Sequence, residues 1–282
     1  MKRFLRKLAK FILDSSSDMR VEVKIAQINY GKILSKRNIV ITGGGSGLGL
    51  EMAKKFVSEG ANVVISGRNE KKLKEAIENI GKNIKYIVSD VTNINEQSKF
   101  LNECERLLDG KIDTLVCNAG ISLHENHFIN VTEESFDKQF NTNFKATYFL
   151  SKYFLEYALR NKNKNNNLLI ISSETGNQCY DIPYGLTKSA LNSMIGAMSR
   201  RVYKDGIRVN GIAPGVTISN MTKDYADNSN GNLYRNCASN RIFLPEEIAE
   251  VATFLISDAS KCISGEVLHT NAGNHLSIFW NE

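Results

Sequence analysis

The chain has 282 residues, of which 42% are hydrophobic and 23% are charged, and its formal net charge is +6. A chain of this length and apolar content buries one large core, so we expect a single domain with an N-terminal extension. Its positive charges are spread along the sequence rather than gathered in a dense stripe, which argues against nucleic acid as a partner. No apolar run approaches the ~20 residues that a transmembrane helix needs.

The cysteines and histidines indicate a compartment and argue against a metal. Five cysteines, odd in number and widely spaced, contain no Cys-x-x-Cys pair, which is typical of free thiols in a reducing cytosol. We therefore expect a cytoplasmic protein. His124 and His127 are close enough to suggest a metal site, but no third ligand lies near them in the sequence. A polar loop without metal is the preferred interpretation.

The N-terminal extension, residues 1–36, begins with a basic amphipathic pattern over residues 1–13. Such a helix makes at most weak peripheral contact with an anionic membrane, and packing on the domain or a frayed tail is the preferred interpretation. Charges interrupt its apolar region and no small-residue cleavage site follows, so it is not a secretory signal. The remaining residues, 37–282, are expected to form one domain.

A glycine cluster separates an apolar run, Asn38 to Thr42, from a helical pattern. Gly43 suits a tight turn, Gly47 lets the backbone approach a ligand, and Gly49 lets the helix lie close to the strand. The free N–H groups and the positive end of the helix dipole then face one point, which favours a phosphate. The turn residues expected to contact a cofactor are Gly43, Ser46, Gly47, Leu48 and Gly49.

From Asn38 onward, strand-like and helix-like segments alternate as in βαβ units. This alternation predicts an α/β domain with a doubly wound parallel sheet, a Rossmann fold, covered by helices on both faces. A polar linker is expected from Asn161 to Asn167. The expected strands are Asn38 to Thr42, Asn62 to Ser66, Ile84 to Ser89, Ile112 to Cys117, Leu168 to Ser172, Arg208 to Ile212 and Val267 to Thr270.

Ligands of such sheets bind at the carboxyl ends of the strands. After the second strand a carboxylate would bind the adenosine ribose and select NAD(H), but the chain has Gly67 and then Arg68. A guanidinium suits a 2′-phosphate, so NADP(H) is favoured, although Arg68 also fits the exposed start of the next helix. After the third strand stand Asp90 and Val91. Asp90 is interpreted either as an acceptor for the adenine amino group or as a helix cap.

Small residues, Asn118-Ala119-Gly120, follow the fourth strand and let the backbone run beside a cofactor. A helix is then expected over Val131 to Leu159. Asn143 lies inside it, although asparagine is a poor helix former that usually sits at helix ends.

A tyrosine and a lysine four residues apart, Tyr184 and Lys188, share one face of an expected helix. Reduction of a carbonyl by hydride requires a proton donor, and an ammonium group beside a phenol stabilises the phenolate. We therefore predict Tyr184 as the acid/base and Lys188 as its activator. Ser173 ends the preceding strand and is expected to orient the carbonyl by a hydrogen bond. Ser172 is the competing hydroxyl.

Taken in chain order, the motifs described above resemble those of the short-chain dehydrogenase/reductase family. The resemblance covers nearly the whole chain beyond the extension. The resemblance implies that Asn143 kinks its helix and holds a relay water, and that Lys188 also binds the nicotinamide ribose. The interval from Ser173 to Tyr184 is shorter than usual for the family. The resemblance also implies contacts with the nicotinamide side of the cofactor from Pro214, Gly215, Thr217 and Ser219.

The resulting prediction is an NADP(H)-dependent oxidoreductase acting on a small carbonyl or alcohol substrate. A 3-oxoacyl-(acyl-carrier-protein) reductase remains an open subtype, because the residues that could form a basic docking surface for the acidic carrier protein point both ways. Asp205 weighs against such a surface. The residues that weigh in its favour are Arg160, Lys162, Arg200 and Arg201. A non-enzymatic NADP(H)-binding sensor or scaffold is disfavoured, because the tyrosine and lysine are both present.

The aromatic residues of Val131 to Leu159 exceed what one sheet face needs to cover, which indicates a further partner. In the family this helix and the one over Leu186 to Arg201 pack against their copies in a neighbouring subunit. A homodimer or homotetramer is therefore expected. The alternative is that Asn165 to Asn167 and the extension cover these rings within one chain.

Overall fold

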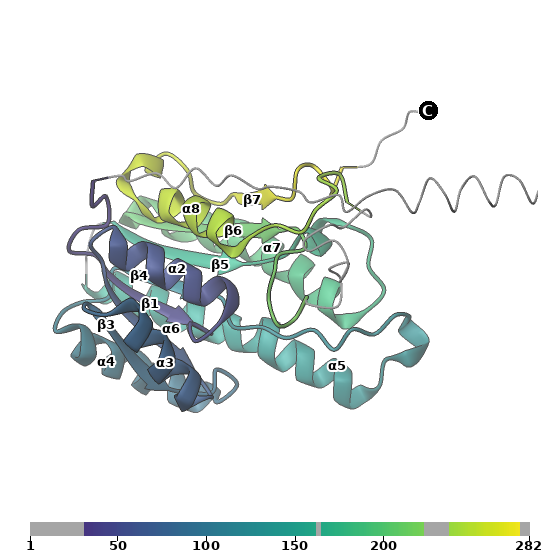
Figure 1. Cartoon of the computed structure of the whole chain (residues 1–282), viewed down its shortest axis with the longest axis horizontal. Coiled ribbons are helices and arrows are strands. Elements are labelled where there is room, and N and C mark those ends of the chain that lie inside the picture. The colour runs from purple at the N-terminus through teal and green to yellow at the C-terminus, as the bar shows by residue number, and fades with distance from the viewer. Residues whose placement is uncertain (1–30, 162–164, 223–236, 277–282) are drawn as a thin grey trace, which may run out of the picture.

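The fold, seen in a computed structural model that describes residues 31–161, 165–222 and 237–276, is built on a seven-stranded parallel sheet (Figure 1). Its strand order is β3-β2-β1-β4-β5-β6-β7, the order of a doubly wound Rossmann sheet. All seven expected strands are confirmed, with bounds that differ by at most two residues at each end. The strands are β1 (Asn38–Thr42), β2 (Asn62–Gly67), β3 (Ile84–Val88), β4 (Thr114–Cys117), β5 (Asn166–Ile171), β6 (Ile207–Pro214) and β7 (Val267–Thr270).

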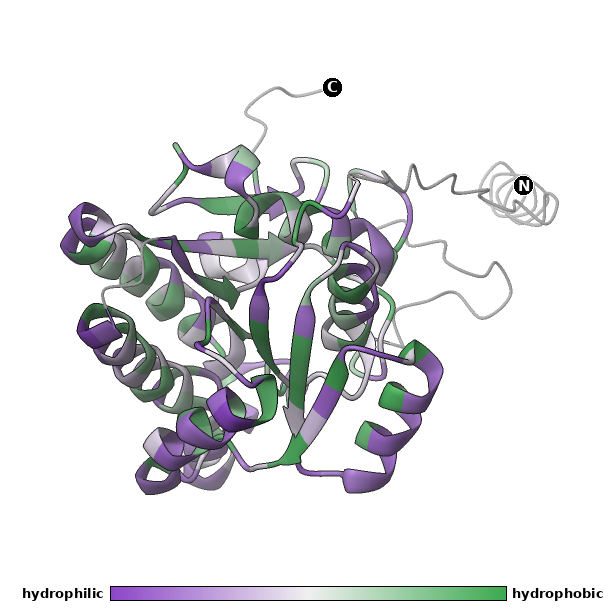
Figure 2. Cartoon of the chain, turned by 90° about the vertical axis from the view of Figure 1, so that its left-hand side faces the viewer, coloured by the Kyte–Doolittle hydropathy of each residue, from purple (hydrophilic) through white to green (hydrophobic). Residues whose placement is uncertain are grey.

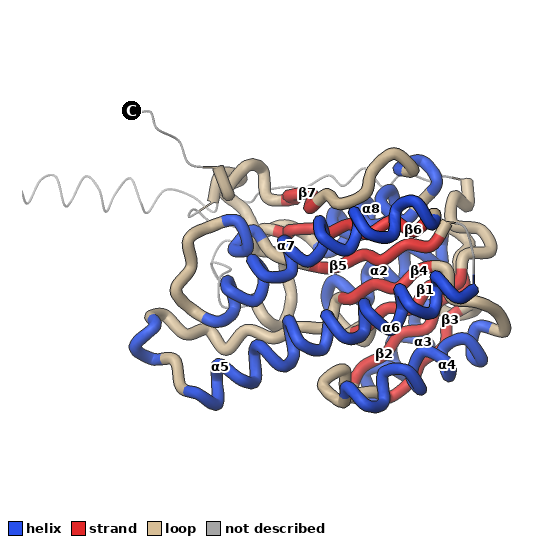
Figure 3. The backbone as a smooth tube through the Cα atoms, turned by 180° about the vertical axis from the view of Figure 1, so that it is seen from behind, coloured by secondary structure: helices blue, strands red, loops and turns tan. Residues whose placement is uncertain are grey.

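Helices cover both faces of this sheet (Figures 1 and 3). The long helices are α2 (Gly47–Ser58), α3 (Glu70–Ile80), α4 (Gln97–Leu108), α5 (Glu133–Gln139), α6 (Ala146–Asn161), α7 (Pro183–Val202) and α8 (Pro245–Ile256). The shorter helical turns are η1 (Ile94–Glu96), η2 (Phe128–Asn130), η3 (Phe140–Lys145), η4 (Glu174–Asn177), η5 (Tyr203–Asp205) and η7 (Asp258–Ser260). Residues of α2, α3 and α8 belong to one hydrophobic core, and residues of α4, α6 and α7 belong to the other.

The alternation of side chains along the strands supplies both cores. In β1, Val40 belongs to one core, and Ile39 and Ile41 belong to the other. Figure 2 shows hydrophobic residues concentrated in the strands and on the inner sides of the helices. A parallel sheet buried on both faces reads as continuous apolar runs, which is why its strands were predictable from the sequence.

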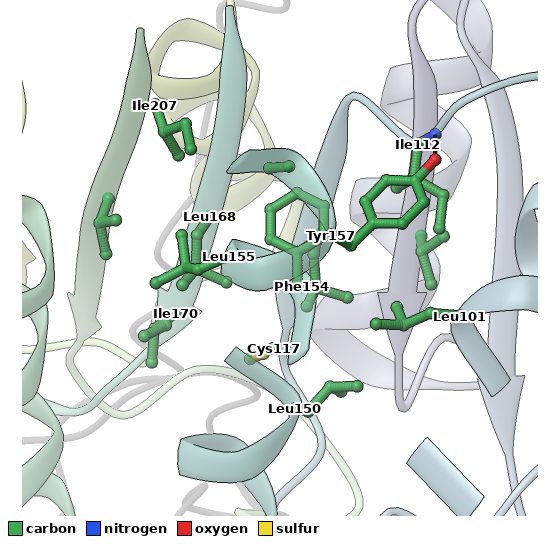
Figure 4. Packing of buried hydrophobic residues seen from close by; sticks show 14 of the residues in the cluster. Leu101, Ile112, Cys117, Leu150, Phe154, Leu155, Tyr157, Leu168, Ile170 and Ile207 are labelled. Atoms are coloured by element: carbon green, nitrogen blue, oxygen red, sulfur yellow. Dashed lines mark hydrogen bonds between the residues drawn. The ribbon is translucent and has the colours of Figure 1, made fainter. Parts of the chain in front are cut away.

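One polar contact inside the core fixes α6 to the strand that carries part of the site (Figure 4). The hydroxyl of the buried Tyr157 accepts a hydrogen bond of 3.0 Å from the backbone N–H of Ile112, just before β4. Burial raises the pKa of Tyr157 to about 12, so the phenol stays neutral. The hydrogen bond satisfies a polar group that the core would otherwise leave unpaired.

The linker prediction is wrong at its C-terminal end, because β5 already begins at Asn166. The side-chain amide of Asn166 donates to the backbone oxygen of Ile112, and that of Asn167 donates to the backbone oxygen of Ile256. Buried amides with such partners fit inside a strand, although asparagine is rare there. Both asparagines are therefore unable to cover the aromatic rings of α6, as one alternative required.

The helix expected over Val131 to Leu159 is confirmed as an uninterrupted helical run from Glu133 to Asn161, but its middle is not α-helical. The segment consists of α5, the π-helical stretch η3 and α6. Asn143 lies within η3 and is only 1% exposed, and its side chain bonds to the backbone of Ile121 rather than to its own helix. The locally unfavourable asparagine thus marks an irregular turn, as π-helical stretches often do at functional sites.

The beginning of the chain is only partly described. Residues 1–30, with the predicted amphipathic helix, lie outside the described residues. Just before β1, Leu34 is fully buried in the core of α2 and donates its backbone N–H to the oxygen of Glu59. Within the described ranges, no helix combines the length and the hydropathy that crossing a membrane requires.

Candidate active site

A cavity of about 750 Å³ opens at the carboxyl ends of the strands. Such a volume accommodates a cofactor-sized ligand. The structure brings the predicted site residues together, since all of them except Gly49 and Asn143 line this cavity. Those that do are Gly43, Ser46, Gly47, Leu48, Arg68, Asp90, Val91, Asn118, Ala119, Gly120, Ser173, Tyr184, Lys188, Pro214, Gly215, Thr217 and Ser219.

The glycine turn forms one end of the cavity. Gly43 and Gly47 have φ values of 67° and 54°, in the left-handed region that favours glycine. A Cβ atom on Gly49 would lie 2.3 Å from the oxygen of Gly43, so this glycine supports the packing of the turn without touching the cavity. Ser46, at the N-cap of α2, makes no side-chain capping bond, so the first N–H groups of α2 are available to an anion.

Asn118 and Thr42 fix the neighbouring loop against the glycine turn. The hydroxyl oxygen of Thr42 accepts hydrogen bonds from the backbone N–H groups of Asn118 and Ala119, at 3.0 and 3.1 Å. In return, the side-chain amide of Asn118 donates to the backbone oxygens of Thr42 and Gly43. These four bonds hold the loop after β4 against the end of β1 and the glycine turn.

Two cations, one just before α3 and one in its first turn, line the cavity. Arg68 and Lys72 both line the cavity and are exposed, and neither has an acidic partner within ion-pair distance among the described residues. Lys72 is not among the cofactor contacts predicted from the sequence. Lys72 stands in the first turn of α3, three residues after the N-cap Asn69, whereas Arg68 precedes that N-cap. A second cation so soon after Arg68 is the sequence signal that could have found it.

Asp90 forms a local turn. One of its carboxylate oxygens accepts from the backbone N–H and the hydroxyl of Thr92. The N-caps of the next two helical segments are Asn93 and Glu96, so the cap interpretation of Asp90 is wrong. The turn holds the Asp90 side chain at the cavity wall.

Lys188 and Tyr184 lie close together in the cavity lining. The ammonium nitrogen of the buried Lys188 donates to the backbone oxygen of Ile171, at 2.9 Å, and lies 5.6 Å from the centre of the Tyr184 ring. Burial lowers the pKa of Lys188 to about 8. Proline at the first position of α7, Pro183, fits the start of the helix that carries both side chains.

The two candidate serines differ in what their hydroxyls do. Ser172 donates to the side-chain oxygen of Asn192, at 2.5 Å, so its proton is engaged. The hydroxyl of Ser173 accepts a hydrogen bond from the backbone N–H of Thr175, and no acceptor for its own proton occurs among the described residues. Ser173 therefore keeps a donor available to a ligand in the cavity.

Asn143 supports the cavity wall through hydrogen bonds without lining the cavity itself. Its side-chain oxygen accepts from the backbone N–H of Ile121 at 2.8 Å, and its amide donates to the oxygen of Ile121 and to the hydroxyl of Thr187. Its side-chain oxygen lies 3.3 Å from the position that a Cβ on Gly120 would take. Asn143 thus joins the loop after β4 to α7.

The loop after β6 closes the opposite wall. The hydroxyl of Thr217 donates to the oxygen of Gly215, and the hydroxyl of Ser219 accepts from the backbone N–H of Met221. Beyond Thr222, residues 223–236 lie outside the described residues.

The sequence reading missed a set of polar residues around the turn that follows Ser173. Buried Glu174 lines the cavity and accepts hydrogen bonds from Asn271 and Asn274. Only the sheet order brings the segment after β7 to this place, so no sequence spacing reveals the contact. In the described part of the chain, no group of three histidine, cysteine, aspartate or glutamate side chains is arranged to hold a metal ion.

Comparison with known proteins gives one consistent similarity. The family model described as Enoyl-(Acyl carrier protein) reductase matches residues 43–275. The 3-oxoacyl-(acyl-carrier-protein) reductase FabG of Rickettsia bellii is 32% identical over 241 residues, which cover 85% of this chain and 97% of that protein. The dehydrogenase/reductase SDR family member 4 of Caenorhabditis elegans is 30% identical over 243 residues, covering 81% and 91%.

Solved structures show the same similarity. A short-chain type dehydrogenase/reductase from Mycobacterium ulcerans superposes with a TM-score of 0.78 at 26% identity, covering 86% of this chain and 90% of that one. The structure of ElxO with NADP bound superposes with a TM-score of 0.78 at 27% identity, covering 85% and 98%.

Proposed function

The chain belongs to the short-chain dehydrogenase/reductase family of oxidoreductases, which act on alcohol and carbonyl groups, and from this premise we propose that it reduces a carbonyl substrate with NADPH. The observation that carries the proposal is a single cavity with a glycine turn and two cations at one end and Tyr184, Lys188 and Ser173 at the other. The glycine turn fits a dinucleotide pyrophosphate, because a helix N-terminus with available N–H groups faces it.

The proposed chemistry divides the work among three side chains. A bound nicotinamide supplies the hydride to the carbonyl carbon. Tyr184 donates its phenolic proton to the carbonyl oxygen, and Lys188 stabilises the phenolate that is left. Ser173 donates a hydrogen bond to the same oxygen, where negative charge develops. Asn143 is proposed to hold a relay water beside Lys188, since it joins the loop after β4 to α7.

NADP(H) is the proposed cofactor. Arg68 and Lys72 together present two positive charges at the end of the cavity where a 2′-phosphate would lie, and the position after β2 offers Gly67 rather than a carboxylate. The bound NADP in ElxO supports the same choice.

A 3-oxoacyl thioester is the second candidate substrate, supported by the names of several relatives. The experiment that tests the proposals is a panel of carbonyl compounds incubated with NADPH or NADH. The panel contains simple ketones, keto-sugars and 3-oxoacyl thioesters on N-acetylcysteamine and on acyl-carrier protein. Turnover of any member supports the oxidoreductase. An equal rate with free and carrier-bound thioesters argues against a carrier-docking subtype, and binding of cofactor without any turnover favours the sensor or scaffold.

We also propose that the protein is a homodimer or homotetramer. The aromatic side chains of α5, η3 and α6 form a partly exposed row, in which Phe136 is 38% and Tyr148 is 40% exposed and Phe136 stacks on Phe140. In Figures 1 and 3, α5 projects from the body of the molecule. Light scattering at micromolar concentration tests this proposal, and a monomer mass contradicts it. A reducing cytoplasm is the proposed location, because all five cysteines are free thiols.

A further inference from the structure

In the turn that carries Ser173, hydrogen bonds hold the residues on both sides of it, Ser172 and Glu174, in place. Before it, the hydroxyl of Ser172 donates to the oxygen of Asn192, whose amide donates to the oxygen of Asn177 at 2.6 Å. After it, the carboxylate of Glu174 accepts from Asn271 at 3.0 Å. Among the described residues, the only partner of the Ser173 hydroxyl is the backbone N–H of Thr175 in the same turn, so the position of that hydroxyl follows the position of the turn.

The stacked rings of His269 and His275 connect Asn177 with Asn271, the partners on the two sides of the turn. The amide of Asn177 lies 2.5 Å from Nε2 of His269, in β7, and the ring of His269 stacks on His275 with centres 3.7 Å apart. Nδ1 of His275 lies 3.0 Å from the side-chain oxygen of Asn271. The network thus runs from one side of the serine turn to the C-terminal segment and back to the other side.

Each hydrogen bond in this network can be assigned one donor and one acceptor without conflict. The oxygen of Asn177 already accepts from Asn192, so its amide is the donor to Nε2 of His269. Burial and the neighbouring His275 lower the pKa of His269, which favours the neutral ring that such an acceptor requires. The amide of Asn271 donates to Glu174, so its oxygen is the acceptor for His275.

The C-terminal turn holds an unfavourable backbone conformation to make these contacts. Ala272 has a φ of 51°, in the left-handed region where a Cβ is costly, and Gly273 follows with a φ of 80°. This turn brings the amides of Asn271 and Asn274 to the same carboxylate oxygen of Glu174. Strain retained in a turn with specific partners is typical of functional sites.

We propose that His269, together with Asn177, is a positioning residue for the reaction, and that it acts only through Ser173 by holding the serine turn against the cavity. The inference rests on the proposed role of Ser173 in orienting the carbonyl. Neither His269 nor Asn177 lines the cavity, so the proposed role is that of positioning residues and not of catalytic ones.

A double-mutant cycle between His269 and Ser173 tests the inference, with kcat, carbonyl KM and the Kd of NADPH as readouts. In the wild-type background, His269→Leu is expected to lower kcat about tenfold and to leave the Kd of NADPH unchanged. The reason is that a displaced Ser173 hydroxyl stabilises less well the negative charge that develops on the carbonyl oxygen. In the Ser173→Ala background, the same substitution is expected to change kcat less than twofold. His269→Gln, which retains a side-chain acceptor, is expected to restore most of the rate.

The control is His127→Leu, which removes a histidine at the N-cap of η2 that accepts a hydrogen bond from the backbone N–H of Ile129 and does not itself line the cavity, and it is expected to leave kcat unchanged. An equal loss in both backgrounds, or no loss in the wild type, overturns the inference. If His269→Leu does not fold, Asn177→Ala replaces it in the same cycle. A wild type that binds NADPH but reduces no carbonyl overturns the proposed function and this inference together, whereas an active wild type with additive losses overturns the inference alone.

Discussion

The ammonium nitrogen of Lys188 lies 5.6 Å from the centre of the Tyr184 ring, one turn away along α7. Removing only the phenolic oxygen, by Tyr184→Phe, deletes the proposed proton donor and leaves the ring and the lysine in place. We expect kcat to fall about 10³-fold, while the Kd of NADPH, measured by cofactor fluorescence, changes less than about twofold. A variant that turned over at a rate near the wild type would refute the assignment of the acid.

The free energy of unfolding should depend on pH through the ionisation of Lys188. Its pKa is about 8 in the folded chain because it is buried, and 10.5 is the ordinary value. Between these values the unfolded chain holds a proton that the folded chain has lost, so this group makes the free energy of unfolding rise with pH. Below pH 8 both states are protonated, and the buried charge opposes folding by on the order of 3 kcal/mol.

Lys188→Met removes this titration. Denaturant unfolding of the cofactor-free protein, followed at several pH values, should show that the advantage of the variant over the wild type is largest at pH 7. The advantage should shrink as pH rises from 8 toward 10.5. Parallel stability curves for the two proteins across that range would contradict the effect of burial on this lysine.

Cofactor choice is expected to depend on Arg68. Arg68→Asp replaces a phosphate-binding cation by a carboxylate suited to a ribose diol, so kcat/KM with NADPH should fall about 10- to 100-fold and the preference should pass to NADH. Lys72→Ala should weaken NADPH alone and by less. Lys71→Asp is the matched control, because Lys71 lies beside Lys72 in the first turn of α3 but does not line the cavity. An NADPH to NADH ratio that Arg68→Asp leaves unchanged would rule the assignment out.

Much of the fold could be predicted because local patterns and global architecture agree. Buried parallel strands read as apolar runs, as Asn38 to Thr42 does, and the glycine turn has a fixed spacing. The residues that follow the strands, such as Asn118 and Ser173, line one cavity because parallel strands bring their carboxyl ends to one edge.

What could not be predicted depends on partners distant in sequence. Asn166 and Asn167 read as a linker because their amides find acceptors only in the folded chain, at Ile112 and Ile256. The π-helical stretch around Asn143 is accompanied by bonds from its side chain to Ile121, a loop residue distant in sequence. The same limit hid the contact of His269 with the serine turn.

An ion-pair cluster with little solvent exposure joins two helices on one face of the sheet. The ammonium group of Lys55, in α2, lies 3.0 Å from carboxylate oxygens of both Glu59, at the end of the same helix, and Glu250, in α8. The three side chains are 12%, 4% and 14% exposed. Burial alone lowers the pKa of Lys55, but the hydrogen bonds to Glu250 and Glu59 outweigh it and raise the pKa, so the lysine stays charged.

Lys55→Met should therefore leave two carboxylates close together without their shared cation, and it should lower the free energy of unfolding by about 3 kcal/mol. Lys54→Met is the control, because its partner Glu51 lies in an exposed pair and the expected change is below about 0.5 kcal/mol. Replacing all three groups, by Lys55→Met with Glu59→Gln and Glu250→Gln, should recover much of the loss, since no charge is then left buried and unpaired. Urea unfolding of the four proteins measures these differences. If the triple variant is no more stable than Lys55→Met, the loss arises from packing of the lysine stem rather than from charge.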